Sequence, residues 1–145
     1  TNITGVKLHV NQVIEAMAQS QIAAGIVVQH FRACAEAEKS RYVFSVELDG
    51  VMPAQEQLSR LLRELDSRLR RLNVEYAQKR DSQRLAAPVL QVMKPGWFER
   101  HANATLQRGA RDVQFKALLL SMALEDPNEI QFAVASAAES AALKA

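Results

Sequence analysis

The residues that could do chemistry are few and widely spaced along this sequence. His9, His30 and His101 do not lie at metal-ligand spacing, and none stands beside Cys34, the single cysteine. The five glycines are scattered singly, so there is no Gly-rich phosphate loop and no nucleophile elbow. No pair of acids stands out as a general acid and base. These residues predict no metal site, and we interpret the lone thiol as buried and inert rather than reactive.

Residues 60–84 form an uneven charge feature, with eight lysines or arginines against four acids. One interpretation is a face that binds phosphate or an acidic partner. The other, which we favour, is a solvated helix face with ion pairs four residues apart. The basic residues are Arg60, Arg63, Arg68, Arg70, Arg71, Lys79, Arg80 and Arg84.

Helices are expected in four places. Apolar residues within 10–17 recur at helical spacing, and Gly25 would end that helix. A leucine stripe over 58–72 predicts the strongest helix of the chain. Shorter helices are expected over 74–84 and 97–107.

Three strands are expected between these helices. Residues 26–32 are β-branched and aromatic, and 88–93 are similar. Residues 41–48 alternate with period two, which predicts one buried and one wetter face. The polar link 35–40 indicates an antiparallel hairpin, while 113–120 is ambiguous between strand and buried helix. The order predicts an α+β fold: a small, mostly antiparallel or mixed sheet of three to four strands with helices packed against it.

Length and composition limit the class of protein. The 145 residues fit one domain, and 48% hydrophobic with 23% charged residues argues against wholesale disorder. A net charge of +2 does not by itself imply a nucleic-acid partner. No apolar run reaches the ~18 to 20 residues of a membrane span, and no signal sequence opens the chain, so we expect a cytoplasmic protein. Residues 1–120 are expected to form the domain, and 121–145 an alanine-rich tail, either helical or frayed.

Three motifs follow one another in order. The first is N-V-E-Y-A-Q-K-R-D-S-Q-R-L at 73–85, the second K-P-G-W-F-E at 94–99, and the third R-G at 108–109 followed by Q-F-K at 114–116. In this order and spacing they resemble the C-terminal domain of the auxin-responsive acyl acid–amido synthetases. That family reads roughly N-x-x-Y-x-x-K-R-x-x-G-R-L, then a P-G-T-F-like turn, then Q-Y-K. The opening T-G-V-K-L at 4–8 is similar to the family's G-E-K-L stretch.

The chain departs from the family pattern at a few positions. Gln83 stands where the family has a glycine, Phe115 where it has a tyrosine, and Val6 where it has an acid. Ala117-Leu118 replaces a segment that usually contains proline. These departures bear on catalytic competence more than on the fold.

The resemblance implies the chemistry of the adenylate-forming enzymes. ATP activates a carboxylic acid to an acyl-adenylate, and the acyl group then passes to the amine of an amino acid. ATP and Mg²⁺ would be bound mainly by a large N-terminal domain, to which nothing in this chain corresponds. The C-terminal domain would act as a mobile lid, which we expect to be inactive on its own.

The resemblance also implies site residues. Lys116 would be catalytic, placing a compact positive charge on a phosphate or adenylate oxygen. Gln114 would contact the nucleotide together with Lys116. Lys7 would be a catalytic cation at the hinge. The alternatives are an ordinary surface lysine and a linker lysine. The basic residues of motif 73–85 would serve a domain interface, and Trp97 would cap a helix onto the core.

The expected partners follow from that assignment. They are the large N-terminal adenylation domain of the same protein, a small-molecule carboxylic acid and an amino acid, with no nucleic acid and no membrane. In isolation, the exposed lid face could promote dimers. The alternative function is a non-enzymatic module whose basic helix, 60–84, contacts nucleic acid or an acidic partner. Interleaved acids and only 6% aromatic residues argue against it.

Overall fold

The computed structural model describes residues 2–3, 6–50, 52–100, 120–121 and 124–135. Two 3-10 turns, Ala37–Lys39 and Pro127–Glu129, accompany the helices and strands of this part. In chain order the helices and strands are β1 (Asn2–Ile3), β2 (Val6–Lys7), α1 (Val10–Ala24), β3 (Val28–Glu36), β4 (Arg41–Leu48), α2 (Gln55–Leu72), α3 (Val74–Asp81), β5 (Val89–Met93), β6 (Leu120–Ser121) and β7 (Ile130–Ala135).

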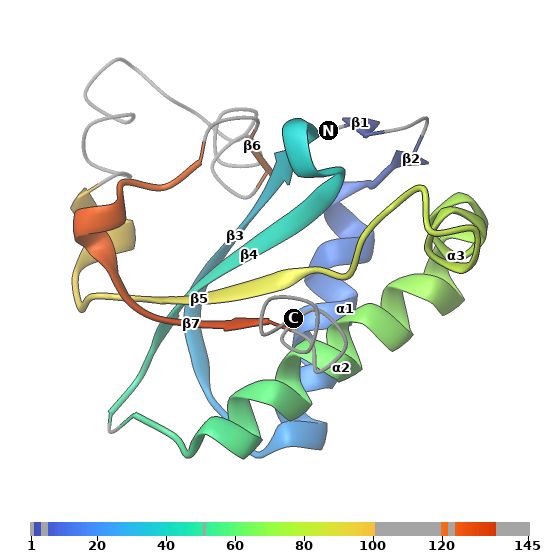
Figure 1. The fold of residues 1–145 in the computed structure, drawn as a ribbon. Coiled ribbons are helices and arrows are strands. Elements are labelled where there is room, and N and C mark those ends of the chain that lie inside the picture. Colours follow the sequence, from blue (N-terminus) through green and yellow to red (C-terminus); the bar gives the residue numbers. More distant parts are fainter. Residues whose placement is uncertain (1, 4–5, 51, 101–119, 122–123, 136–145) are drawn as a thin grey trace.

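A mixed sheet forms one layer of the molecule, in the order β6-β3-β4-β5-β7 (Figure 1). Strands β3 and β4 make the expected antiparallel hairpin. Strand β5 runs parallel to β4, because α2 and α3 carry the chain back between them. Strand β7 is antiparallel to β5, and the two-residue β6 is parallel to β3. The expected α+β class, with a mixed sheet and packed helices, is confirmed.

Helices α1 and α2 pack against each other and cover one face of the sheet (Figure 1). The predicted leucine stripe faces this core. Gly25 ends α1 with φ +69, the left-handed conformation that a helix C-cap favours. The buried leucines of α2 are Leu58, Leu61, Leu62, Leu65 and Leu69.

The second face of β4 differs from the expectation of a wetter surface. Val43, Ser45 and Glu47 are buried, just as their neighbours on the helix side are. The physical reason is the position of β4 near the middle of the sheet, together with the turn around Trp97, which bonds to Glu47 on this second face. Alternation in sequence therefore marked the strand correctly but did not identify a solvent face.

The C-terminal segment contains a strand that was not expected. Residues 130–135 pair with β5 as β7, so this part of the tail is neither helical nor frayed. Its Val134 is buried, and β7 contacts α2. Of the predicted helix 97–107, only the first residues are described, and they are helical. Most of the ambiguous segment 113–120 and residues 136–145 lie outside the described residues.

Candidate functional site

The predicted site residues fall in two different parts of the chain. Lys7 pairs with Asn2 in the β1–β2 ribbon, which contacts α3 (Figure 1). The chain therefore passes the 73–85 motif directly before it enters α1. Gln114 and Lys116 lie outside the described residues, so their roles stay predictions.

Motif 73–85 forms α3 and holds this helix against α2 through hydrogen bonds. Asn73 caps α3, since its Oδ1 accepts a hydrogen bond from the backbone N–H of Tyr76 at 2.9 Å. The Tyr76 hydroxyl donates to Asp66 Oδ1 at 2.6 Å. Arg80 donates to both oxygens of Asp66, at 2.9 and 2.8 Å. We call Asp66, Tyr76 and Arg80 the Asp66 cluster.

Electrostatics in the Asp66 cluster favour its ion pair. Burial would raise the pKa of Asp66, but hydrogen bonds from Arg80 and Tyr76 and the charges of Arg80 and Arg70 outweigh it and hold that pKa below its usual range. Burial, followed by the charge of Asp66, raises the pKa of Tyr76 well above its usual range. The phenol therefore stays protonated as a donor. Tyr76 and Arg80 of the motif act here as structural groups that join two helices.

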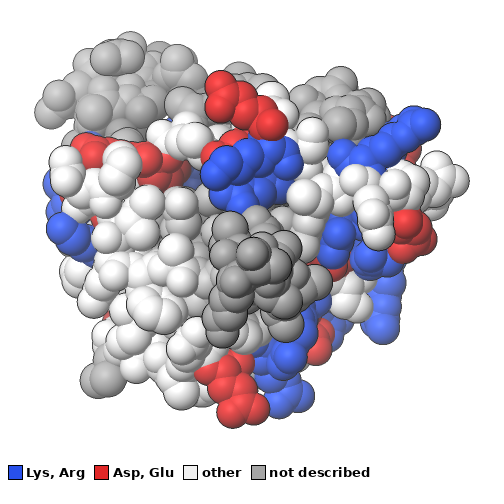
Figure 2. All heavy atoms as spheres, in the orientation of Figure 1, with Lys and Arg blue, Asp and Glu red and all other residues white. Residues whose placement is uncertain are grey.

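Some of the basic residues in 60–84 form ion pairs. Arg68 lies 3.3 Å from Glu64, and Arg70 lies 2.6 Å from Asp81. Figure 2 shows the Lys and Arg side chains gathered over α2 and α3 with acidic side chains among them. This arrangement favours the ion-paired helix face over a phosphate-binding face. Four arginines remain exposed without an acid partner within the described part of the chain: Arg60, Arg63, Arg71 and Arg84.

The P-G-W-F turn of the second motif is fixed by two buried glutamates. Glu47 of β4 accepts hydrogen bonds from the backbone N–H groups of Gly96 and Phe98, at 3.2 and 2.9 Å. Trp97 is fully buried, and its indole N–H donates to Glu125 at 3.0 Å. The expectation that Trp97 anchors this helix start onto the core is confirmed. Sequence reasoning missed both glutamates, because Glu47 occupies an alternating strand position that usually faces water.

Cys34 of β3 is buried and pairs with Val43, on the same sheet face as Glu47. Burial, and then the nearby charge of Glu125, raises the pKa of this thiol to about 11. Since the thiolate is the nucleophilic form, a pKa this high makes the group unreactive at neutral pH. The predicted burial of this thiol is confirmed, and the raised pKa is in keeping with an inert group.

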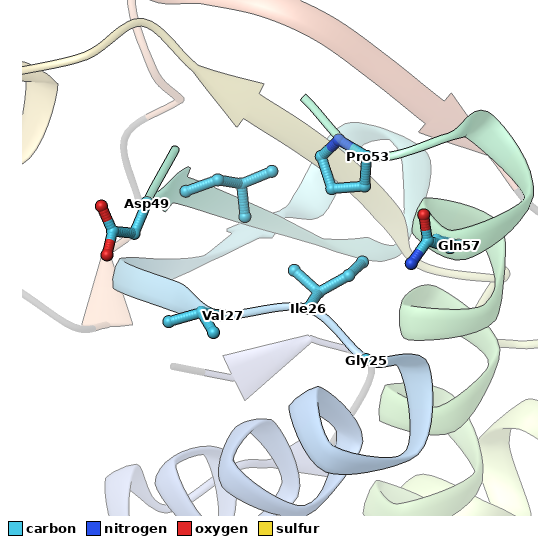
Figure 3. A pocket seen from close by; sticks show the side chains of 7 residues that line it. Gly25, Ile26, Val27, Asp49, Pro53 and Gln57 are labelled. Carbon is cyan, nitrogen blue, oxygen red and sulfur yellow. The ribbon is translucent and has the colours of Figure 1, made fainter. Parts of the chain in front are cut away.

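Two hollows lie where α1 ends, and neither has the lining of a reaction site. One of about 270 Å³ is bounded by Ile26, Pro53 and Gln57 among others, and the Asp49 carboxylate points away from it (Figure 3). The second, of about 390 Å³, is lined mainly by apolar residues such as Ile22. Ligand sites combine an apolar cavity with convergent polar groups, which these hollows do not provide. Both also lie at the far end of α1 from Lys7.

Neither a metal-binding cluster nor a membrane-spanning helix occurs among the described residues. There, no group of three or more His, Cys, Asp or Glu side chains is arranged to hold a metal ion. No helix in the same ranges combines the length and apolar character needed to cross a bilayer.

Comparison with known proteins decides the family. The model of the GH3 family C-terminal domain matches residues 9–123. This chain belongs to the GH3 family. The resemblance seen in the three motifs is thereby confirmed, and motif 73–85 together with the P-G-W-F turn lies within the matched range.

Two solved structures share the fold of this GH3 domain. One is described as "GH3.15 acyl acid amido synthetase", with a TM-score of 0.74 and 15% identity over 94% of this chain. The other is "AtGH3.15 acyl acid amido synthetase in complex with 2,4-DB", with a TM-score of 0.70 and 14% identity over 88% of this chain. The matched parts cover 27% and 25% of those chains, so the domain spans about a quarter of their length. Comparison with curated proteins gave no match.

Proposed function

We propose that this domain is the mobile C-terminal lid of an ATP-dependent acyl acid–amido synthetase. The enzyme would adenylate a carboxylic acid and conjugate it to an amino acid. The observation that carries the proposal is the family match over 9–123, which coincides with a fold shared with two structures named as acyl acid amido synthetases.

The content of the described part supports a lid rather than a complete enzyme. The chain covers 27% and 25% of the two matched structures, and the two hollows at the end of α1 lack convergent polar groups. We assign ATP and Mg²⁺ mainly to a large N-terminal adenylation domain, which is the proposed partner. The position of the β1–β2 ribbon against α3 supports a role of motif 73–85 next to the hinge.

Three residues carry the proposed chemistry. Lys116 supplies a positive charge to an anionic phosphate or adenylate oxygen, an interaction that strengthens as charge develops in the transition state. Gln114 contributes a hydrogen bond to the nucleotide. Lys7, at the end of β2, contacts the nucleotide phosphates or the carboxylate of the amino acid from the hinge side.

The test uses the complete protein that contains these residues. Carboxylic acids are screened by ATP–pyrophosphate exchange, and amide products with amino acids are identified by mass spectrometry. Lys116→Ala is expected to lower the rate of one or both half-reactions by about 100-fold. Lys39→Ala, an exposed lysine in the β3–β4 turn, is the matched control and should leave the rate unchanged.

Three results would each contradict a part of the proposal. If none of the carboxylic acids supports ATP–pyrophosphate exchange, the ligase function is contradicted. If Lys116→Ala keeps the full rate, only the role of Lys116 is contradicted. Tight, stoichiometric ATP binding by the 145-residue chain alone, measured by calorimetry, would contradict the lid assignment.

A further inference from the structure

The outer face of α1 carries an apolar row where a surface helix normally has charged side chains. Ile14, Ala18 and Ile22 follow one another at four-residue spacing, which places them on one side of the helix, and all three are exposed. Ile22 is 84% exposed, and Val27, just beyond the end of α1, is 65% exposed. Glu15 is the single charged residue of this helix. The sequence of α1 is therefore suited to burial of both faces, although the sheet lies against only the opposite one.

The hollows at the C-terminal end of α1 extend this apolar row. Ile22 and Val27 line the hollow of about 390 Å³. Val27 also borders the neighbouring hollow, together with Pro53 and Gln57 (Figure 3). An apolar cavity without convergent polar groups is unsuited to a reaction, but it suits an aliphatic side chain of a partner, as at the centre of a protein–protein interface.

A row of arginines on α2 lies beside the apolar row. The two helices pack against each other, and Gln57 of α2 lies next to Gly25 at the end of α1. Arg60 is about one turn beyond Gln57, and Arg63 and Arg71 follow it at helical spacing. All three arginines are exposed and have no acid partner in the part of the chain that the structure describes. We call the apolar row of α1 and these arginines together the α1–α2 face.

The type of basic residue on α2 is informative. The five basic residues of this helix are all arginines. Arginine is enriched in protein–protein interfaces and lysine is depleted, because the planar guanidinium is weakly hydrated and can form two parallel hydrogen bonds with one carboxylate. Unpaired arginines beside an apolar row therefore fit a partner surface that carries carboxylates around an apolar centre.

We propose that the α1–α2 face docks on the large N-terminal adenylation domain, at an acidic surface with apolar side chains at its centre. This inference rests on the proposed function, which supplies that domain as the partner. The two solved structures that share the fold extend well beyond the matched parts, which are 27% and 25% of their length. The β1–β2 ribbon, which would join the two domains, contacts α3, and α3 directly follows α2. Such a tether keeps the partner close, so that even a weak contact is substantially occupied.

Two other occupants fit the α1–α2 face less well. A second copy that used the same face would bring arginine against arginine in a symmetric dimer. Helices that bind a membrane surface use tryptophan, phenylalanine or leucine beside their basic side chains, whereas the apolar side chains here are isoleucine, valine and alanine. Charge complementarity therefore favours an acidic protein surface.

Site-specific photo-crosslinking in the complete protein tests the proposal. The photoreactive residue p-benzoylphenylalanine replaces Ile22, whose exposed side chain makes the substitution harmless to the fold, and the cross-linked peptides are identified by mass spectrometry. The expected product is a cross-link within one molecule, to an acidic segment of the large domain. The same replacement at Lys39, an exposed position beyond the other end of β3, is the matched control and should give at least about tenfold less of this product.

Charge reversal tests the role of the arginines in the same assay. Arg60→Glu should lower the yield of the cross-link from position 22 by about tenfold, because like charges then meet across the contact. Lys39→Glu, which reverses an exposed charge elsewhere, should leave the yield unchanged. An unchanged yield in Arg60→Glu would overturn the proposed charge complementarity.

Three further outcomes would overturn the docking proposal. One is the absence of an internal cross-link from position 22. Another is a cross-link between two molecules, recognised in a mixture of isotope-labelled and unlabelled protein, which would assign the face to a second copy. The third is sedimentation with phosphatidylserine vesicles but not with phosphatidylcholine vesicles, weakened by Arg60→Glu, which would assign it to a membrane. ATP–pyrophosphate exchange is measured on the same preparations. An active protein without the internal cross-link overturns only the docking, whereas an inactive protein that forms it contradicts only the proposed catalysis.

Discussion

A left-handed backbone at Gln83 explains one position of motif 73–85. Gln83 lies two residues after the end of α3 and has a φ of +62. The family pattern has a glycine at this position. Residues with a Cβ atom pay roughly 1–2 kcal/mol in this conformation, and glycine does not. This chain therefore forms the turn with a less suitable residue than glycine.

Gln83→Gly should stabilise the domain by up to about 1 kcal/mol, because relief of the strain exceeds the extra entropy of glycine in the unfolded chain. Gln78→Gly, in the exposed interior of α3, is the matched control and should destabilise by about 1 kcal/mol. Urea denaturation midpoints measure both. Equal losses in the two variants would contradict a strained backbone at position 83.

At the scale of elements, α3 depends on the Asp66 cluster to hold it against α2. The helix has eight residues, too few to be stable alone, and Tyr76 is its one fully buried side chain in the described structure. Hydrogen bonds to Asp66 join it to the middle of α2. The β1–β2 ribbon contacts α3 in turn, so a loosened α3 would also loosen the entry of the chain into the domain.

The lowered pKa of Asp66 predicts how stability depends on pH. The carboxylate is favoured by folding, so its contribution is complete above the unfolded value of about 3.9 and is lost as pH falls through the folded pKa below that value. Asp66→Asn should lower stability at pH 7 by about 2 kcal/mol and flatten the acid dependence below about pH 4. Asp81→Asn, at an exposed ion pair, should change little. Urea titrations at pH 7 and at pH 2.5–4 measure these effects; an unchanged acid limb in Asp66→Asn would contradict the assignment.

At the scale of the whole molecule, β7 closes the sheet beside β5. It pairs with β5 and buries Val134, which is 4% exposed, while the adjacent Ala133 is exposed. The segment 124–135 thus supplies an edge strand and also Glu125 and Glu129, which bind the 94–100 turn. Segment 124–135 therefore contacts both β5 and the residues around Trp97.

Val134→Asp should destabilise the domain by about 3 kcal/mol or more, since it buries a charge without a partner. Ala133→Asp, one residue away on the exposed side of the strand, should cost less than about 1 kcal/mol. Thermal or urea unfolding distinguishes the two. Similar small effects at both positions would show that 130–135 does not pack as a strand.

The sequence by itself determined the three helices α1, α2 and α3, the hairpin and the family. The leucine spacing of 58–72, the alternation of 41–48 and the glycine at position 25 are local patterns, and each reflects geometry that a few neighbouring residues set. The ordered motifs similarly identified the family before any fold was considered.

Only the tertiary structure decided what the polar residues do. Asp66 and Arg80 are 14 residues apart, Glu47 and Phe98 are 51 apart, and no local pattern relates them. Strand β7 was missed for the same reason, because its partner β5 lies some 40 residues earlier and pairing depends on contacts across the sheet. A buried carboxylate and a solvated one look alike in sequence; they differ in which distant donors the fold brings to them.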